Sequence, residues 1–292
     1  MYSKAELKKY SDAVATIKSI TRVYEEAAAR RIKLVQLSVE KIDDFVGAAA
    51  DTYLNVKFGL LAEQRDKKAP KQNILTSSFR KKTKKGITVL ITSKDQYYGN
   101  LIPNIYREWH KDMLETKFDG IILGNTGTHL FEKEEIKFAN VESFDLDDSN
   151  IDWKVIYQIG ERISQYEKIV VYYGAYKTVL TQVAEKNDIS NSISVGQVQK
   201  VKRYLFEAKG EKILGDVETD VIKALLQKRI YQSQIAKYAA RIKILEIGQV
   251  AEKMSQVLGD LSKGRKKVHK NLNNKKQLQL YTGVDLWEGE SQ

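Results

Sequence analysis

Apolar residues recur at steps of three and four along residues 1–64, with charged and polar residues between them. This spacing is typical of an α-helix that buries one face. Only Gly47 and Gly59 interrupt the block, and it contains no proline, the strongest helix breaker. At about 1.5 Å per residue, a helix over most of the block would be about 80–90 Å long. Its apolar positions are Leu7, Tyr10, Val14, Ile17, Ile20, Tyr24, Ala27, Leu34, Ile42, Phe45, Ala49, Tyr53, Val56 and Leu60.

A second amphipathic pattern runs through residues 201–292. Apolar residues again recur at helical spacing from Leu214 to Leu272, and neither glycine nor proline occurs between Gly215 and Gly248. Two long amphipathic helices at opposite ends of one chain predict an antiparallel coiled coil. Two unrelated helical domains are the alternative.

The middle of the chain has a different pattern. Residues 87–91, 120–123 and 169–173 are short, continuously apolar runs rich in β-branched residues. Helix-like segments at 101–115 and 155–167 separate them. Apolar strands that alternate with helices predict a parallel sheet buried on both faces.

The predicted fold class is therefore α/β, with a long antiparallel coiled coil of terminal helices and an inserted Rossmann-like α/β domain. We expect a coiled-coil helix over 1–64, a basic linker over 65–85, and the α/β domain over 86–200. The C-terminal coiled-coil helix and a basic tip complete the chain over 201–292.

The charge of the chain indicates what kind of partner it binds. The 292 residues contain 49 Lys and Arg against 38 Asp and Glu, a net charge of +11. The excess lies in residues 65–85 and 263–276, while residues 86–200 carry a net negative charge. This distribution favours an acidic partner or an anionic surface. The basic run at 263–276 lacks interleaved aromatic residues and any nucleic-acid-binding motif, so we expect no nucleic-acid partner.

Composition also excludes several classes of site and protein. The chain has no cysteine, which excludes disulfides, thiolate metal sites and a cysteine nucleophile. It has no apolar run near the roughly 20 residues of a membrane span. The opening MYSKAELKKY lacks the apolar stretch of a signal peptide. We expect an intracellular protein that is at most peripheral to a membrane.

Two glycine-containing turns fall short of nucleotide-binding motifs. Gly174-Ala-Tyr-Lys177-Thr178 has a Lys-Thr pair but not the spacing of a phosphate-binding loop. Gly124-Asn-Thr-Gly127 lacks the third glycine of a dinucleotide fingerprint, so we interpret it as a tight strand-to-helix turn.

Other candidate sites are weaker. The acidic stretch 145–152 resembles a calcium loop but has neither its central glycine nor its terminal glutamate, so we expect a solvated acidic loop. The three histidines are scattered without metal-ligand spacing. We therefore expect no metal, no cofactor and no independent catalytic site on this chain.

Six short motifs occur in an order that matches a known family. They are IKSITRVYEEAAARRIK (17–33), VLITSKDQYYGNL (89–101), IILGNTGTHLF (121–131), EKIVVYYGAYKTVLTQ (167–182), YLFEAKG (204–210) and IAKYAARIKIL (235–245). Together with the helix–domain–helix layout, they resemble the gamma subunit of F-type rotary ATP synthases over nearly the whole chain.

The resemblance implies a mechanical function. The two terminal helices would form a shaft that turns inside a hexamer of alpha and beta subunits and couples ATP synthesis or hydrolysis to rotation. The α/β domain would lie at the base, next to an epsilon-like subunit and the c-ring. ATP, ADP and Mg²⁺ would bind partner subunits, and the chain would be cytoplasmic, peripheral on the inner face of the cell membrane.

The resemblance also implies three groups of contact residues. The groups are Arg30, Arg31, Arg265, Lys266 and Lys267 for the hexamer; Leu278, Leu280 and Tyr281 for a bearing at the shaft tip; and Tyr204 and Glu207 at the base, towards the c-ring.

Departures from the family pattern leave alternatives open. Ala208 stands where the family has proline, and the acids of the family tail are basic or neutral over 273–280. One alternative is the rotor of a specialised ATP-hydrolysing motor, such as a mollicute gliding machine. Another is a coiled-coil adaptor with an α/β binding head, outside any rotary ATPase.

Overall fold

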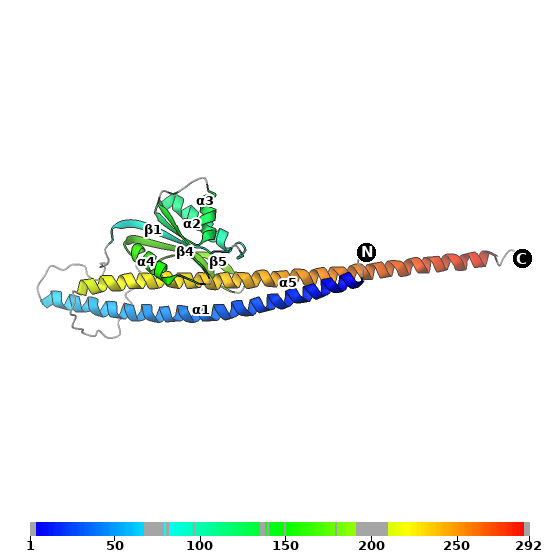
Figure 1. The fold of residues 1–292 in the computed structure, drawn as a ribbon, viewed down its shortest axis with the longest axis horizontal. Helices are drawn as coiled ribbons and strands as arrows, with labels where there is room; N and C mark the ends of the chain where they lie inside the picture. Colours follow the sequence, from blue (N-terminus) through cyan, green and yellow to red (C-terminus); the bar gives the residue numbers. More distant parts are fainter. Residues whose placement is uncertain are drawn as a thin grey trace. The chain divides into compact units, whose positions relative to one another are not determined.

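The computed structural model divides into two compact units, Met1–Ile244 and Leu245–Gln292, and we describe each by itself (Figure 1). The structure describes residues 4–66, 79, 82–95, 97–134, 138, 140–148, 150–178, 180–190 and 210–288.

Two long helices begin and end the described chain. Helix α1 spans Lys4–Asp66 and helix α5 spans Gly210–Glu288. At about 1.5 Å per residue, α1 is about 95 Å long. Within the first unit, Asp43 of α1 pairs with Lys228 of α5, and Tyr53, further along α1, bonds Glu218, earlier on α5. Because the partner numbers run in opposite directions, the two helices are antiparallel, as the sequence predicts.

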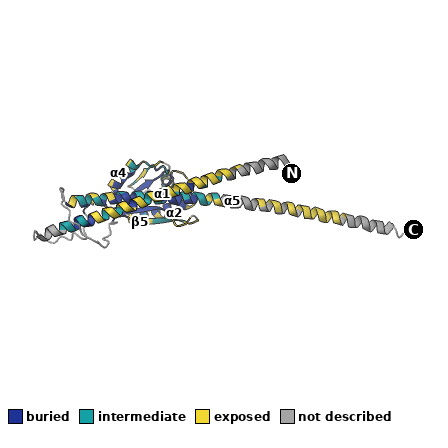
Figure 2. Cartoon of the chain, turned by 90° about the horizontal axis from the view of Figure 1, so that it is seen from below, coloured by how far each residue is buried: buried dark blue, intermediate teal, exposed yellow. Residues whose placement is uncertain are grey.

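Apolar side chains hold the two helices together. Tyr53 and Val56 of α1 form a buried cluster with Leu214 of α5. A Cβ at Gly210 would meet Leu60 at 2.8 Å, so the absence of a side chain lets the start of α5 approach α1 closely. Figure 2 shows the buried stretches of both helices beside the sheet.

The α/β domain contains a five-stranded sheet with the order β3-β2-β1-β4-β5. Strand β1 pairs in parallel with β2 and β4, and β2 pairs in parallel with β3. Strand β5 pairs antiparallel with β4. The strands are β1 Lys84–Ile91, β2 Asp119–Leu123, β3 Val141–Phe144, β4 Tyr166–Tyr176 and β5 Gln182–Asp188.

Helices cover both faces of this sheet. Helix α2 (Leu101–Thr116) packs on one face, where Trp109 and Met113 are fully buried against Leu90 and Ile122. Helix α4 (Trp153–Ile163) packs on the other face with α5, in a cluster that includes Ile163 and Leu226. Helix α3 (Asn125–Glu132) directly follows β2.

The sheet corrects two sequence expectations. It is mixed rather than wholly parallel, because β5 returns antiparallel along the edge. The sequence of β5, QVAEKND, is polar and half-exposed, so this strand lacks the apolar run by which the buried strands were predicted. The helix expected over 155–167 ends at Ile163, and β4 already begins at Tyr166. The domain boundaries stay predictions, since 67–78 and 191–209 lie outside the described residues.

Candidate functional site

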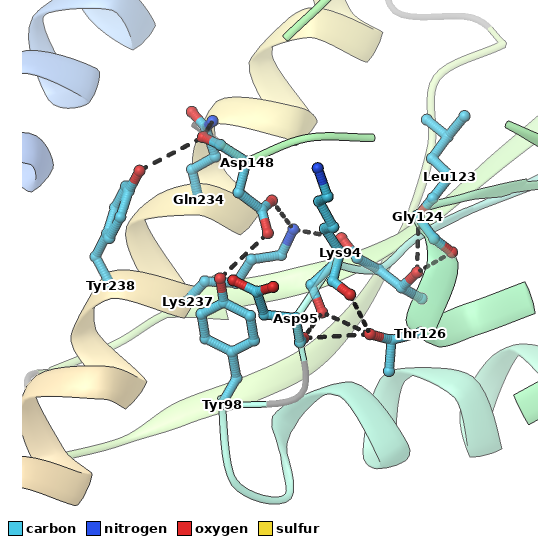
Figure 3. A network of polar contacts seen from close by, with 12 residues as sticks. Lys94, Asp95, Tyr98, Leu123, Gly124, Thr126, Asp148, Gln234, Lys237 and Tyr238 are labelled. Carbon is cyan, nitrogen blue, oxygen red and sulfur yellow. Dashed lines mark hydrogen bonds and ion pairs between the residues drawn. The ribbon is translucent and has the colours of Figure 1, made fainter. Parts of the chain in front are cut away.

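The most connected polar site lies where α5 crosses the carboxyl ends of the parallel strands. In open α/β sheets, this edge is where ligands commonly bind, close to the point at which strand connections change direction. Here the side chain of Lys237 occupies that position (Figure 3). The loop after β1 and the loop after β3 both converge on it.

Lys237 and Asp148 form a buried ion pair. Their charged atoms lie 2.6 Å apart, and the side chains are only 2% and 10% exposed. The ammonium of Lys237 also donates a hydrogen bond to the backbone carbonyl of Thr92, the residue directly after β1. Burial lowers the pKa of Lys237, and the Asp148 carboxylate partly offsets this effect. Removing either partner would therefore leave an uncompensated buried charge.

Asp148 holds further hydrogen bonds. The Tyr98 hydroxyl donates to its carboxylate at 3.2 Å, and burial beside this carboxylate raises the pKa of Tyr98. The side-chain amide of Gln234 donates to the Asp148 backbone carbonyl at 2.8 Å. The Tyr238 hydroxyl lies 3.5 Å from the same carbonyl. Both the charge and the backbone of Asp148 are thus bound by α5.

Arg241 extends the contact by one helical turn. Its guanidinium lies 3.1 Å from the Asp95 carboxylate and 5.0 Å from the centre of the Tyr98 ring. Gln234 and Arg241 lie three and four positions from Lys237, and Tyr238 lies next to it, which places all four on one side of α5. We call this site the polar clasp; it consists of Gln234, Lys237, Tyr238 and Arg241 of α5 and Thr92, Asp95, Tyr98 and Asp148 of the α/β domain.

Backbone geometry beneath the clasp fixes the loop after β1. The Thr92 hydroxyl donates to the Leu123 carbonyl at 2.8 Å and accepts from the Gly127 N–H at 3.1 Å. Gly124 has φ +105°, and a Cβ there would lie 2.8 Å from the Ser93 nitrogen. The strand-to-helix turn predicted at Gly124 is confirmed. At the start of α3, the Thr126 N–H donates to the Ser93 carbonyl and the Gly127 N–H to the Thr92 hydroxyl.

A second buried junction lies towards the other end of the helix pair. Glu218 of α5 accepts hydrogen bonds from the Tyr53 hydroxyl at 2.6 Å and from the Phe79 N–H at 3.0 Å. Lys57 of α1 is 4% exposed and donates to the Tyr53 hydroxyl at 3.3 Å. Burial lowers the pKa of Lys57, while nearby Glu218 opposes the change. Three parts of the chain meet at this carboxylate: α1, α5 and the segment that precedes β1.

One groove of about 500 Å³ lies between α1, α5 and the β4–β5 edge. The sheet-side charges that line it bond each other, because Glu185 accepts from Lys177 at 2.5 Å and from Tyr173 at 3.1 Å. The described residues contain no cluster of three or more metal-ligating side chains. None of the described helices has a stretch long and apolar enough to span a bilayer.

The structure places only some of the predicted contact residues. Arg30 and Arg31 are exposed on α1, and Lys266 and Lys267 are exposed on α5 in the second unit. The other predicted contacts lie outside the described residues or side chains; they are Tyr204, Glu207, Arg265, Leu278, Leu280 and Tyr281.

The prediction of a solvated loop over 145–152 is wrong for Asp148, although Asp145, Asn150 and Asp152 are exposed. Asp148 is buried by Lys237, and Asp152 caps α4 by accepting the Lys154 N–H at 3.0 Å. The clasp itself was not predicted. A signal does exist in the sequence: Lys237 stands between Ala236 and the pair Ala239 and Ala240, all three of which are buried, so a cation lies among small residues that pack in the core.

Comparisons with known proteins agree on one family. A family model described as ATP synthase matches residues 3–247. The ATP synthase gamma chain of Rickettsia canadensis (strain McKiel) is 22% identical over 175 residues, which cover 56% of this chain and 60% of that relative. The chain is thus matched to less than two thirds of that relative's length.

A solved structure from Tetrahymena thermophila shows the same fold. A chain of the mitochondrial ATP synthase central stalk and c-ring from Tetrahymena thermophila aligns with a TM-score of 0.53 at 16% identity, covering 79% of this chain and 99% of that chain. A chain of the Euglena gracilis mitochondrial ATP synthase (OSCP/F1/c-ring) has a TM-score of 0.44 at 14% identity, covering 89% and 96%.

Proposed function

The chain belongs to the ATP synthase gamma-subunit family, and on that premise we propose that it is the central rotor shaft of an F-type or F-type-like rotary ATPase. It turns inside a hexamer of alpha and beta subunits and couples ATP synthesis or hydrolysis at the beta subunits to rotation. The observation that carries this proposal is the antiparallel α1–α5 pair, whose helices are joined at Tyr53 and Glu218 and bound to the α/β domain through the buried Lys237–Asp148 pair.

The helix pair has the properties that a turning shaft needs. Its apolar seam and its buried hydrogen bonds resist unwinding. The outer face of α1 carries exposed apolar residues, among them Val23, Tyr24 and Leu34, which are 59–64% exposed. Shallow, scattered apolar contacts bind a surrounding ring about equally well at several rotation angles of the shaft, so no single angle is strongly preferred.

The cationic positions fit electrostatic contacts with the hexamer. Arg30 and Arg31 are exposed on α1, as are Lys266 and Lys267 on α5. Exposed ion pairs contribute only about 0–1 kcal/mol each, so they can form and break as the shaft turns. In this proposal, Arg265 joins them at the hexamer contact.

The remaining contacts follow the family arrangement. Leu278, Leu280 and Tyr281 form an apolar bearing at the shaft tip, and Tyr204 and Glu207 face the c-ring at the base. An epsilon-like subunit binds beside the α/β domain. The chain itself binds no nucleotide, metal or cofactor, and ATP, ADP and Mg²⁺ bind the partner subunits. The complex is cytoplasmic and peripheral on the inner face of the cell membrane.

A specialised hydrolytic motor, such as a mollicute gliding machine, is the second form of this function. The observation that favours it is the tail over 273–280, Asn-Asn-Lys-Lys-Gln-Leu-Gln-Leu, which is basic or neutral where the family has acids. Such a motor contains the same hexamer and rotor but uses ATP hydrolysis for motility rather than for ion transport.

Native co-purification tests the proposal directly. We expect the tagged chain to bring down two different nucleotide-binding subunits, three copies of each per rotor, and the eluate to hydrolyse ATP. Recovery of c-ring subunits distinguishes a synthase from a specialised motor. Elution of the chain alone, without ATPase activity, would overturn the rotor assignment and favour a coiled-coil adaptor.

A further inference from the structure

We propose that the polar clasp is the joint that carries torque between the α/β domain and the shaft, with Lys237 and Asp148 as its positioning residues. The inference rests on the proposed rotor function and assigns a role within it to a site whose polar groups bond each other. Lys237 fills the place at which an α/β sheet usually binds a small molecule. The edge of the sheet therefore binds a helix of its own chain.

Apolar packing alone gives α5 little resistance to slipping at this level of the sheet. In the buried cluster with α2, α5 contributes Ala236 and Ala240, and both have small side chains. A Cβ at Gly174 of β4 would lie 3.3 Å from the Ala236 Cβ, so glycine meets alanine at this contact. Burial of apolar surface is non-directional. Two smooth surfaces can slide or turn against each other without losing much of it.

Hydrogen bonds of the clasp supply the missing direction. Lys237 reaches two loops at once, the backbone of Thr92 after β1 and the carboxylate of Asp148 after β3. One turn further along α5, Arg241 binds Asp95. Charge-assisted hydrogen bonds depend on distance and angle and are about twice as strong as neutral ones. Rotation of α5 about its own axis, or sliding along it, breaks bonds to at least one loop.

The burial of the ion pair supports a positional role. A buried pair is often no more stable than apolar residues of similar volume, because removing both charges from water opposes their attraction. Stability alone therefore does not require Lys237 and Asp148. What apolar residues cannot supply is a single fixed register between helix and domain.

The test replaces the pair by apolar residues and measures stiffness. The double variant Lys237→Met/Asp148→Leu removes both charges together, so neither is left alone in the core. The matched control is Lys228→Met/Asp43→Leu, which removes a lysine–aspartate pair on the same helix that binds α1 instead of the α/β domain. The chain lacks cysteine, so one cysteine at exposed Arg107 of α2 gives a unique attachment point for a bead.

With the hexamer fixed to a surface, the resting angular variance of the bead reports the stiffness of the path through the clasp. We expect the variance of the double variant to rise about twofold, in line with the greater strength of charge-assisted bonds, and that of the control to stay at the wild-type value. ATP hydrolysis should continue in both variants, because the nucleotide sites are on other subunits.

Each outcome bears on a different claim. If the wild-type chain neither assembles nor turns, the proposed function fails. If it turns but the double variant keeps the wild-type variance, or the control broadens equally, the clasp is not the torque-bearing joint. If the double variant does not fold, Arg241→Gln, at a half-exposed pair, replaces it. A smaller broadening then supports the joint, and an unchanged variance rejects it.

Discussion

Replacing Lys237 alone by methionine should destabilise the α/β domain more than replacing Lys237 and Asp148 together. Methionine fills most of the lysine volume, so the packing change is small. Asp148, only 10% exposed, keeps its bond from Tyr98 but loses its only ion-pair partner among the described residues. Breaking a buried pair on one side typically costs about 3–5 kcal/mol.

A second argument limits the magnitude. In Lys237→Met, the Asp148 carboxylate, which has lost its lysine partner, can take up a proton instead of staying charged. Protonating an ordinary aspartate at pH 7 costs about 4 kcal/mol. The loss for Lys237→Met should therefore lie at about 3–4 kcal/mol, whereas Lys237→Met/Asp148→Leu should lie within about 1.5 kcal/mol of the wild type.

Urea unfolding followed by tryptophan fluorescence measures both values. Trp109 is fully buried and its indole N–H donates to the Thr88 hydroxyl at 3.0 Å, so it reports on the α/β domain. A loss below about 1 kcal/mol for the single variant, in the range of exposed pairs, would refute the claim that the pair is buried and coupled. So would a double variant that is less stable than the single one.

Four further predictions follow from the same structure. Burial lowers the pKa of Lys237, so between that lowered pKa and about 10.4 the folded chain binds fewer protons than the unfolded chain. The free energy of unfolding should therefore rise with pH across this window. The Lys237→Met variant should show no such rise. Burial raises the pKa of Tyr172, which donates to Asp112 at 2.6 Å, so stability should fall as the pH passes about 10, and Tyr172→Phe should weaken that fall in alkaline unfolding curves. Glu218→Gln should lower the free energy of unfolding in urea by about 1–3 kcal/mol, because it weakens the bonds from Tyr53 and from the Phe79 N–H. The control Asp220→Asn, at a largely exposed position on the same helix, should change this free energy little. Equal losses in the two variants would contradict a buried junction at Glu218. Gly124→Ala should lower the midpoint of thermal unfolding, because φ is +105° and the new Cβ would lie 2.8 Å from the Ser93 nitrogen. We expect about 1–3 kcal/mol of backbone strain. An unchanged midpoint in a calorimetric scan would show that the backbone of this turn adjusts without strain.

Periodicity made most of the architecture predictable. Strands β1, β2 and β4 are buried over most of their length, and α1 buries one narrow face, so their apolar residues repeat at the spacing of the element. Strand β5 carries no such signal, because its position at the edge of the sheet leaves polar side chains half-exposed. The antiparallel direction of the helix pair also followed from the sequence, since one domain separates two amphipathic blocks.

The clasp could not be predicted in the same way. Lys237 and Asp148 are separated by 89 positions, and no local pattern connects them. Asp148 stands among other acids, a composition typical of solvated loops, and its burial depends wholly on where α5 crosses the sheet. Motif searches look for residues that bind ligands, whereas this polar site binds another part of the same chain.

Polar contacts bind α5 at two separate levels: Glu218 binds Tyr53 of α1 and the Phe79 N–H before β1, and Lys237 binds the α/β domain. Glu218 and Lys237 lie 19 positions apart on one helix, which is about 28 Å along its axis. A body fastened at a single point can pivot there, but one fastened at both ends of such a span can tilt only if the helix between the two points bends. Between the two levels, Ile222, Leu226 and Ile230 of α5 lie in the same buried cluster as the sheet, so a tilt of the domain against α5 would disrupt apolar packing as well as hydrogen bonds.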